Sequence, residues 1–293
     1  MLGQQIFNGL ILGCIYALLA VGYSLVFGIL RLLNMSHGAV YTAGAFMGLL
    51  AASYLHMGVV PTILFAMILT GFINVCIIRI VLQPLREQGA ANITMLISVT
   101  GVSYIIQNGL MLIFGSEKLP FPKAFDFGSF HIGGILVTST QVMIIVVTVI
   151  LLIALGIITK YTKAGLAMRC IAQNPKAANM VGIDVRWIIN FTFIISGMCA
   201  AIAGYMVAGY YQLVYFTMGT TAGLKAFAAA VLGGIGVLSG SVVGGILIGL
   251  CEALATIIFG GEYSEATAYV ILFLGLLIKP SGLFGKDNIN EKV

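Results

Sequence analysis

A cluster of polar side chains stands between two long apolar runs near the start of the chain. Asn34, Ser36 and His37 lie within four residues of one another and closely follow Arg31, with no acidic residue nearby to pair with them. An imidazole changes its charge near neutral pH, and amide and hydroxyl groups can hydrogen-bond a passing solute or a neighbouring helix. The cluster is therefore either a turn at a membrane surface or polar machinery inside a membrane.

Glu252 is a second candidate, because it stands some twelve residues into an apolar run that begins at Gly240. That spacing places it roughly 18 Å along a helix. An ionised carboxylate at such a depth costs a few kcal/mol, so we expect it to face the bundle interior, to pair with another group, or to stay protonated. Its functional interpretation is a group that lines a translocation pathway or stabilises a broken region at 223–240. A purely structural hydrogen bond is the alternative.

A polar stripe occurs in the apolar run 92–114. Thr100, Ser103 and Gln107 are spaced three and four residues apart, which puts them on one face of a helix. Helix-to-helix hydrogen bonds explain such a stripe at least as well as a wet pathway does. Gln107 remains a pathway candidate on this pattern.

The rest of the chain must position these groups inside a membrane. Of its 293 residues, 60% are hydrophobic and 8% are charged, against about a quarter charged in a soluble domain, and the mean hydropathy is +1.12. The apolar runs are continuous, whereas a β-barrel would alternate. The sequence therefore predicts an all-α integral membrane protein, a polytopic bundle of about 8–9 membrane segments. The five cysteines are scattered and predict neither a disulfide framework nor a metal site.

Nine segments are predicted to enter the membrane: 6–30, 38–55, 60–82, 92–114, 137–158, 188–209, 223–236, 240–259 and 266–280. The segment 223–236 is too short to cross alone, and the glycines around it predict a broken helix: Gly233, Gly234, Gly236 and Gly240. Pairs such as Gly9 and Gly13, four residues apart, predict close helix packing, and we expect it to lie within this chain.

The basic residues predict the orientation. Under alternating crossings ten of them fall on one side, which should be cytoplasmic: Arg79, Arg86, Lys160, Lys163, Arg169, Lys176, Arg186, Lys279, Lys286 and Lys292. Lys118, Lys123 and Lys225 then fall on the outer side, and 115–136 forms an outer, periplasmic loop. The N-terminus is expected outside and the C-terminus in the cytoplasm. The net charge of +5 is thus interpreted as an orientation signal, with no nucleic-acid partner expected.

The loop 160–187 is the long cytoplasmic connection, and its pattern predicts two short helices at 165–173 and 176–181. Asn174 is expected to cap the second helix, with Pro175 in its first turn, and Gly182 suits a C-cap. Apolar side chains at helical spacing, such as Met180 and Val181, imply a surface against which the loop packs. Composition alone favours lipid and a soluble partner about equally.

Several motifs in a fixed order carry a resemblance to a known family. They are Asn34-Met-Ser-His-Gly, the loop Ala164-Gly-Leu-Ala-Met-Arg-Cys with Asn179-Met-Val-Gly-Ile, Lys225-Ala-Phe-Ala-Ala-Ala-Val-Leu-Gly-Gly-Ile-Gly, and Gly244-Gly-x-x-x-Gly-x-x-Glu. From about Phe7 to the Gly282-Leu-Phe-Gly tail, the chain resembles the LivH-type permease subunits of branched-chain amino acid ABC importers. One departure is Ala39, where family members often carry an acidic residue.

The resemblance implies a single permease domain over 1–293 that carries leucine, isoleucine or valine across the inner membrane by alternating access. ATP and Mg²⁺ would be bound by separate subunits, since the chain has no phosphate-binding loop motif, and this chain would bind no cofactor and not be an enzyme. The other implied partners are a second permease chain, identical or related, and an external substrate-binding protein. The loop 160–187 becomes the coupling segment, with Gly165, Arg169, Asn174, Pro175 and Gly182 as its candidate residues, and Asn34, Ser36 and His37 become candidates for a gate or pathway.

Other functions were weighed against this one. A permease for urea or short amides would look similar. A stand-alone secondary transporter or channel should carry several intramembrane carboxylates, whereas Glu252 is the one good candidate, and it would leave the loop 160–187 without a task. An intramembrane hydrolase is disfavoured because the chain has neither a G-x-S-x-G nor an H-E-x-x-H motif.

Overall fold

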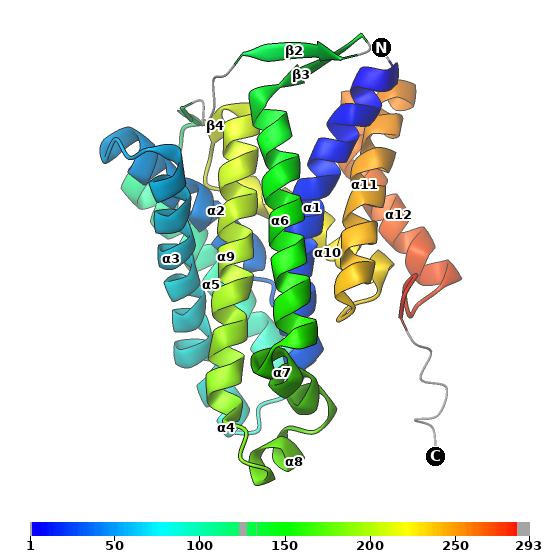
Figure 1. Ribbon diagram of the computed structural model, residues 1–293. Coiled ribbons are helices and arrows are strands. Elements are labelled where there is room, and N and C mark those ends of the chain that lie inside the picture. The colour runs from blue at the N-terminus through cyan, green and yellow to red at the C-terminus, as the bar shows by residue number, and fades with distance from the viewer. Residues whose placement is uncertain (1, 123–127, 133, 286–293) are drawn as a thin grey trace.

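The fold is a helical bundle, described here from a computed structural model that covers residues 2–122, 128–132 and 134–285 (Figure 1). Its helices are α1 (Leu2–Leu30), α2 (His37–Leu49), α3 (Val59–Ile77), α4 (Gln83–Glu87), α5 (Asn92–Phe114), α6 (Ser139–Tyr161), α7 (Lys163–Gln173), α8 (Pro175–Met180), α9 (Val185–Tyr211), α10 (Met218–Gly233), α11 (Leu238–Phe259) and α12 (Ser264–Ile278). Short π-helical turns extend α2 (Leu50–Tyr54) and join α3 to α4 (Ile78–Leu82), and a 3₁₀ turn (Gly261–Tyr263) precedes α12.

Two small antiparallel sheets lie at the end of the bundle where α1 begins (Figure 1). The strand β2 (Ser129–Ile132) pairs with β3 (Ile135–Thr138), and β1 (Leu119–Pro120) pairs with β4 (Leu213–Val214). α7 and α8 lie at the opposite end. The predicted outer loop 115–136 falls partly outside the described residues, as do Lys123, Lys286 and Lys292.

Each of the nine predicted segments corresponds to a helix. Seven helices of the described chain have the length and apolar character to cross a membrane. The other two of the nine are α10, which the glycines had indicated, and α2 with its π-helical extension. The all-α, multi-pass architecture expected from the sequence is confirmed.

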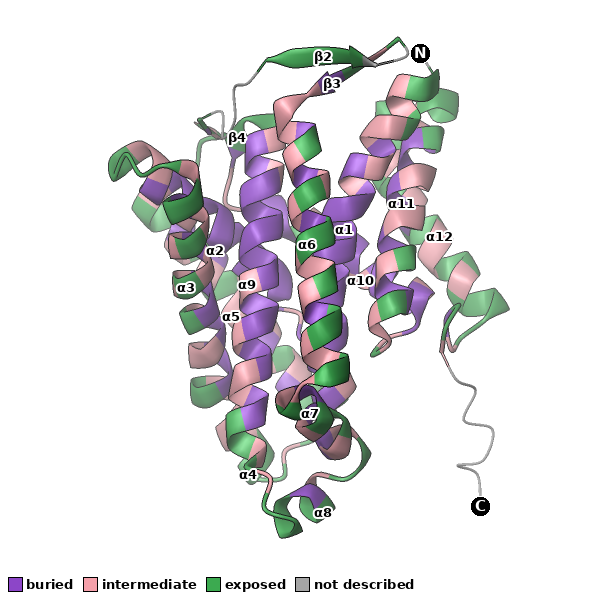
Figure 2. Ribbon diagram, in the orientation of Figure 1, coloured by how far each residue is buried: buried purple, intermediate pink, exposed green. Residues whose placement is uncertain are grey.

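α1 and α9 form the centre of the bundle, while α3, α5, α6 and α12 surround them with exposed apolar side chains (Figure 2). On α3, for example, Leu64, Ile68 and Phe72 are all more than half exposed. Such outward apolar surfaces are what a lipid environment requires, since an apolar patch of this extent is not tolerated in water.

Glycines bring α1 and α11 into backbone contact. A Cβ built on Gly249 would lie 2.3 Å from the backbone nitrogen of Gly13, and one on Gly9 would lie 2.8 Å from the carbonyl oxygen of Gly249. In a membrane, van der Waals contact between helices replaces the hydrophobic drive, so small residues at the contact are needed. The expectation that Gly9 and Gly13 pack within this chain is confirmed.

The corner between α10 and α11 is built from the predicted glycines. Gly234 (φ +105°) and Gly236 (φ +89°) adopt the left-handed conformation, and the backbones of Gly233 and Gly240 pack against each other. The last carbonyls of α10 are satisfied by the C-terminal tail: the N–H of Leu283 donates to Leu232 (2.8 Å) and that of Phe284 to Gly233 (3.1 Å). Without these donors, the end of α10 would leave carbonyls unsatisfied.

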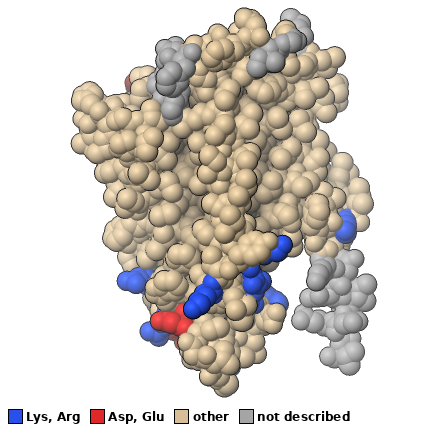
Figure 3. Space-filling view, viewed as in Figure 1, with Lys and Arg blue, Asp and Glu red and all other residues tan. Residues whose placement is uncertain are grey.

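Lysines and arginines gather at the end that holds α7 and α8 (Figure 3). This asymmetry agrees with the side that the alternating topology gave to the eight of those ten basic residues that the structure describes. Lys225, which the predicted topology placed on the outer side, lies within α10 with 7% of its surface exposed.

Candidate functional site

The polar cluster after α1 lies inside the bundle rather than at its edge. Asn34, Ser36 and His37 are each at most 2% exposed. A Cβ on Gly22, two turns before the end of α1, would lie 2.5 Å from Nε2 of His37. The chain therefore turns back into the bundle before α2 begins.

The members of this cluster bond to one another and to neighbouring helices. Ser36 is the N-cap residue of α2. The Oδ1 of Asn34 accepts hydrogen bonds from the backbone N–H (3.2 Å) and the hydroxyl (2.6 Å) of Ser36. His37 Nδ1 lies 3.5 Å from the hydroxyl of Ser196, and its ring stacks edge-on against Tyr23 with centroids 4.6 Å apart. The cluster thus ties the start of α2 to α1 and α9.

Gln107 and Glu252 do not join this cluster. The Gln107 amide donates to the hydroxyl of Thr220 in the first turn of α10 (3.1 Å). Glu252 contacts Lys225, five residues further along the same helix, which is roughly 140° around its axis. Gln107 and Glu252 therefore contact α10 on different faces, and among the described residues neither is hydrogen-bonded to the cluster of Asn34, Ser36 and His37.

Glu252 forms a buried ion pair that the sequence analysis missed. Its Oε1 lies 2.6 Å from Nζ of Lys225 and also accepts a hydrogen bond from the hydroxyl of Ser264. Lys225 reaches the hydroxyl of Tyr16 as well (3.5 Å), with its Nζ 5.7 Å from the centre of that ring. Of the alternatives expected for Glu252, the structure has its carboxylate paired. The pattern that could have indicated this partner was the single lysine, Lys225, inside an apolar run.

At the opposite end, α7 is fastened to the end of α6. The Thr162 hydroxyl accepts the backbone N–H of Gly165 (3.2 Å), and a Cβ on Gly165 would lie 2.3 Å from the carbonyl oxygen of Thr159. The guanidinium of Arg169 donates to that same carbonyl. Gly165 and Arg169 therefore hold α7 in place within this chain.

α8 has the predicted start. Oδ1 of Asn174 accepts the backbone N–H groups of Lys176 (3.0 Å) and Ala177 (3.1 Å), and Pro175 occupies the first helical position. The first backbone N–H groups of a helix have no acceptor within the helix, and a capping side chain supplies one. Proline at the first helical position has no N–H group, so no donor is left unpaired there.

α8 also has the predicted end. Gly182 adopts φ +85°, its N–H donates to the carbonyl of Asn179, and the N–H of Ile183 donates to that of Ala178. This pair of bonds is the Schellman motif, which requires the left-handed conformation that glycine adopts at no steric cost. The six-residue helix is fixed at both ends.

Replacing Asn174 by alanine is expected to loosen α8. The change removes both capping hydrogen bonds and should cost about 1 kcal/mol of local stability. The measurement is the hydrogen-exchange rate of the backbone amides in 176–180, which should rise. An Asn174→Asp variant keeps an accepting oxygen and is the matched control. Unchanged exchange in the alanine variant would show that packing alone holds α8.

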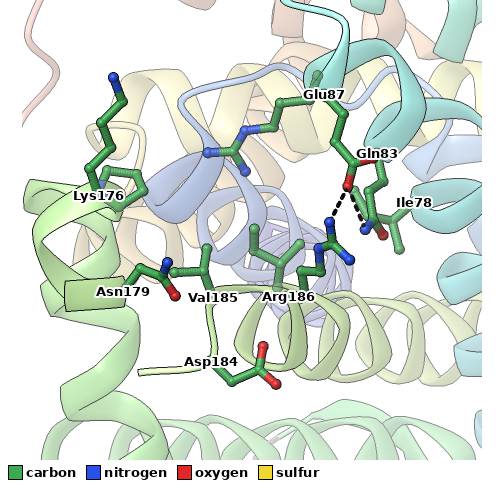
Figure 4. A pocket seen from close by; sticks show the side chains of 11 residues that line it. Ile78, Gln83, Glu87, Lys176, Asn179, Asp184, Val185 and Arg186 are labelled. Carbon is green, nitrogen blue, oxygen red and sulfur yellow. Dashed lines mark hydrogen bonds and ion pairs between the residues drawn. The ribbon is translucent and has the colours of Figure 1, made fainter. Parts of the chain in front are cut away.

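A groove of about 570 Å³ lies between α4 and the segment that runs from α8 into α9 (Figure 4). On one wall, the Glu87 carboxylate binds Arg186 (2.9 Å) and the amide of Gln83 (3.1 Å). Lys176 and Asn179 line the other wall. The sequence analysis did not predict that α4 lines this groove. The polar residues that follow the apolar segment 60–82 were the pattern that could have indicated it.

Comparisons with known proteins agree over the whole chain. A profile of the family described as "Branched-chain amino acid transport system / permease component" matches residues 5–278. The high-affinity branched-chain amino acid transport system permease protein LivH of Salmonella typhimurium is 35% identical over 304 aligned residues, covering 99% of this chain and 97% of that protein. The corresponding protein BraD of Pseudomonas aeruginosa is 36% identical over 302 residues, with the same coverage.

One solved structure has a similar fold. PsaBC from Streptococcus pneumoniae in complex with Fab aligns with a TM-score of 0.52, covering 94% of this chain and 92% of that chain. Its sequence identity of 12% limits this likeness to the fold.

Proposed function

This chain belongs to the family of branched-chain amino acid transport system permease components, and on that premise we propose that it carries leucine, isoleucine and valine through the inner membrane as one subunit of an ATP-driven importer. The relatives named for these substrates support the choice of solute. The energy comes from separate ATP-binding subunits, because this chain has no phosphate-binding loop of its own. A second permease chain and an external substrate-binding protein complete the assembly.

The proposed orientation follows from the charges. The basic end, with α7 and α8, faces the cytoplasm (Figure 3). The start of α1 and the hairpin β2–β3 then face outward, where a substrate-binding protein would approach. Solute passes between these ends by alternating access, with Asn34, Ser36 and His37 as the proposed gate at the start of α2.

The observation that carries the coupling proposal is the exposed tip of α8. Met180 is 86% exposed and Val181 77% exposed, although both belong to a segment with fixed capping at each end. In Figure 1, α8 is the element furthest from the outer end, beyond the ends of the long helices. An apolar pair held rigidly on the surface marks a contact with another protein, and here that protein is the ATP-binding subunit. Gly165, Arg169, Asn174, Pro175 and Gly182 position the tip.

Replacing Met180 and Val181 together by glutamate is expected to release the ATP-binding subunits. The two carboxylates would be buried at an apolar contact without partners, which abolishes such interfaces. The measurements are co-purification of the subunits from native membranes and leucine uptake, both of which should fall to background. Tyr54→Glu changes a side chain that is 67% exposed at the other end of the bundle and should leave co-purification intact. Full co-purification with the double variant would refute the assignment of α8.

A further inference from the structure

A cavity of about 290 Å³ lies near the outer end of the bundle, beside β4 and the first turn of α10. This volume is at the lower end of the range for small-molecule sites. Part of its wall is apolar: Leu12, Val207, Leu213, Met218 and Ala222. The wall also carries two lysines, Lys118 and Lys225, and the carboxylate of Glu265. Opposite charges beside an apolar wall suit a small zwitterion with an aliphatic side chain.

Lys225 has the chemistry to receive the anionic end of such a solute. Its ammonium group has three N–H donors; Glu252 accepts one and the Tyr16 hydroxyl is a second, longer contact. The third has no acceptor among the described residues, although Lys225 lines the cavity. An ammonium that contacts a carboxylate and a hydroxyl is held in place, as a charge-assisted contact to an entering carboxylate requires.

Stability alone does not account for this pair. Lys225 and Glu252 are 7% and 5% exposed, and a buried ion pair is usually no more stabilising than two apolar side chains of similar size. The Oε2 atom of Glu252 is moreover buried without a hydrogen-bond partner in the part of the chain that the structure describes. A group that only needed to fill space would not leave a carboxylate oxygen unsatisfied.

We infer that Lys225 binds the carboxylate of the transported amino acid in the outer cavity, and that Glu252 is a positioning residue that holds the Lys225 ammonium toward it. Glu265 supplies the negative charge for the amino group, and the apolar wall contacts the aliphatic side chain. The inference rests on the proposed function, because it names the site at which the proposed solute enters this chain.

The test uses the complete importer, reconstituted in liposomes with its ATP-binding subunits and a saturating amount of binding protein. Lys225→Met with Glu252→Leu removes both charges and should still assemble. Leucine uptake should fall about tenfold or more, the effect of losing one charge-assisted hydrogen bond. Lys225→Glu with Glu252→Lys keeps an ion pair but reverses the charge at the cavity, and it should lose uptake as well. If either assembled variant imports leucine as the wild type does, the pair is structural and the inference is overturned.

A second measurement reports on the carboxylate itself. Leucine binding to the complex without its binding protein is measured by equilibrium dialysis, with isoamylamine, which is leucine without its carboxylate, as competitor. In the wild type, isoamylamine should compete about tenfold more weakly than unlabelled leucine, and the neutral double variant should lose this difference. Equal competition in the wild type would overturn the inference while leaving the proposed function intact. A wild-type importer that assembles but moves no branched-chain amino acid would refute the proposed function itself.

Discussion

Replacing Lys225 alone by methionine is expected to lower the free energy of unfolding by about 3–5 kcal/mol. The change leaves the Glu252 carboxylate buried without the ammonium that lies 2.6 Å from its Oε1. Ser264 would be its remaining neutral partner, and one hydroxyl cannot replace a charge in a poorly solvated site. The measurement is the denaturant midpoint of the purified chain in detergent, converted with the slope of the transition.

Two variants serve as controls for this result. Lys225→Met with Glu252→Leu should recover most of the loss, because no unpaired charge remains. Glu87→Gln breaks the ion pair with Arg186. The side chains of Glu87 and Arg186 are 53% and 74% exposed, so this change should lower the free energy of unfolding by less than about 1 kcal/mol. A Lys225→Met protein that unfolds at the wild-type midpoint would mean that water reaches Glu252.

Replacing Gly249 by alanine is expected to destabilise the bundle by about 1–3 kcal/mol or more. The new Cβ would lie 2.3 Å from the nitrogen and 2.5 Å from the Cα of Gly13. Both are backbone atoms, so no side chain can rotate away and α1 must separate from α11. The measurement is the thermal midpoint in detergent, supported by the denaturant series.

Gly156 provides the matched control, because the same substitution should there have the opposite effect. It lies in α6, and a Cβ at this position would meet nothing within 4 Å. Alanine in an unhindered helix position is favoured over glycine by about 0.5–1 kcal/mol. If Gly156→Ala and Gly249→Ala shifted the midpoint equally, contact between the α1 and α11 backbones could not be the cause.

Much of this architecture was predictable because a membrane leaves few alternatives. Apolar run length alone places the long helices, since every backbone group must be paired within a helix. Local chemistry fixed α8, where Asn174, Pro175 and Gly182 each have the role that their residue types indicate. The corner glycines after α10 were predictable for the same reason: left-handed conformations favour glycine.

What could not be predicted depends on depth and on rotation about helix axes. The rule that places lysines at membrane surfaces treats every lysine alike, so it assigned Lys225 to the outer side and did not indicate that this side chain is buried. Its partner is on the next helix, and only the packing of α10 against α11 brings the two charges together. Likewise, one sequence cannot show that Gln107 and Glu252 approach α10 from different sides, nor that the turn after α1 re-enters the bundle before His37.

The hydrogen bonds from Leu283 and Phe284 to the end of α10 bear on how the protein is made. These two residues leave the ribosome after the helices α10 and α11 whose corner they complete. A nascent chain that stalls after Ile278 would already contain every long helix, yet the carbonyls of Leu232 and Gly233 would lack their donors. The corner is therefore completed only once Phe284 has been made, and until then the end of α10 is held by fewer hydrogen bonds than in the finished fold.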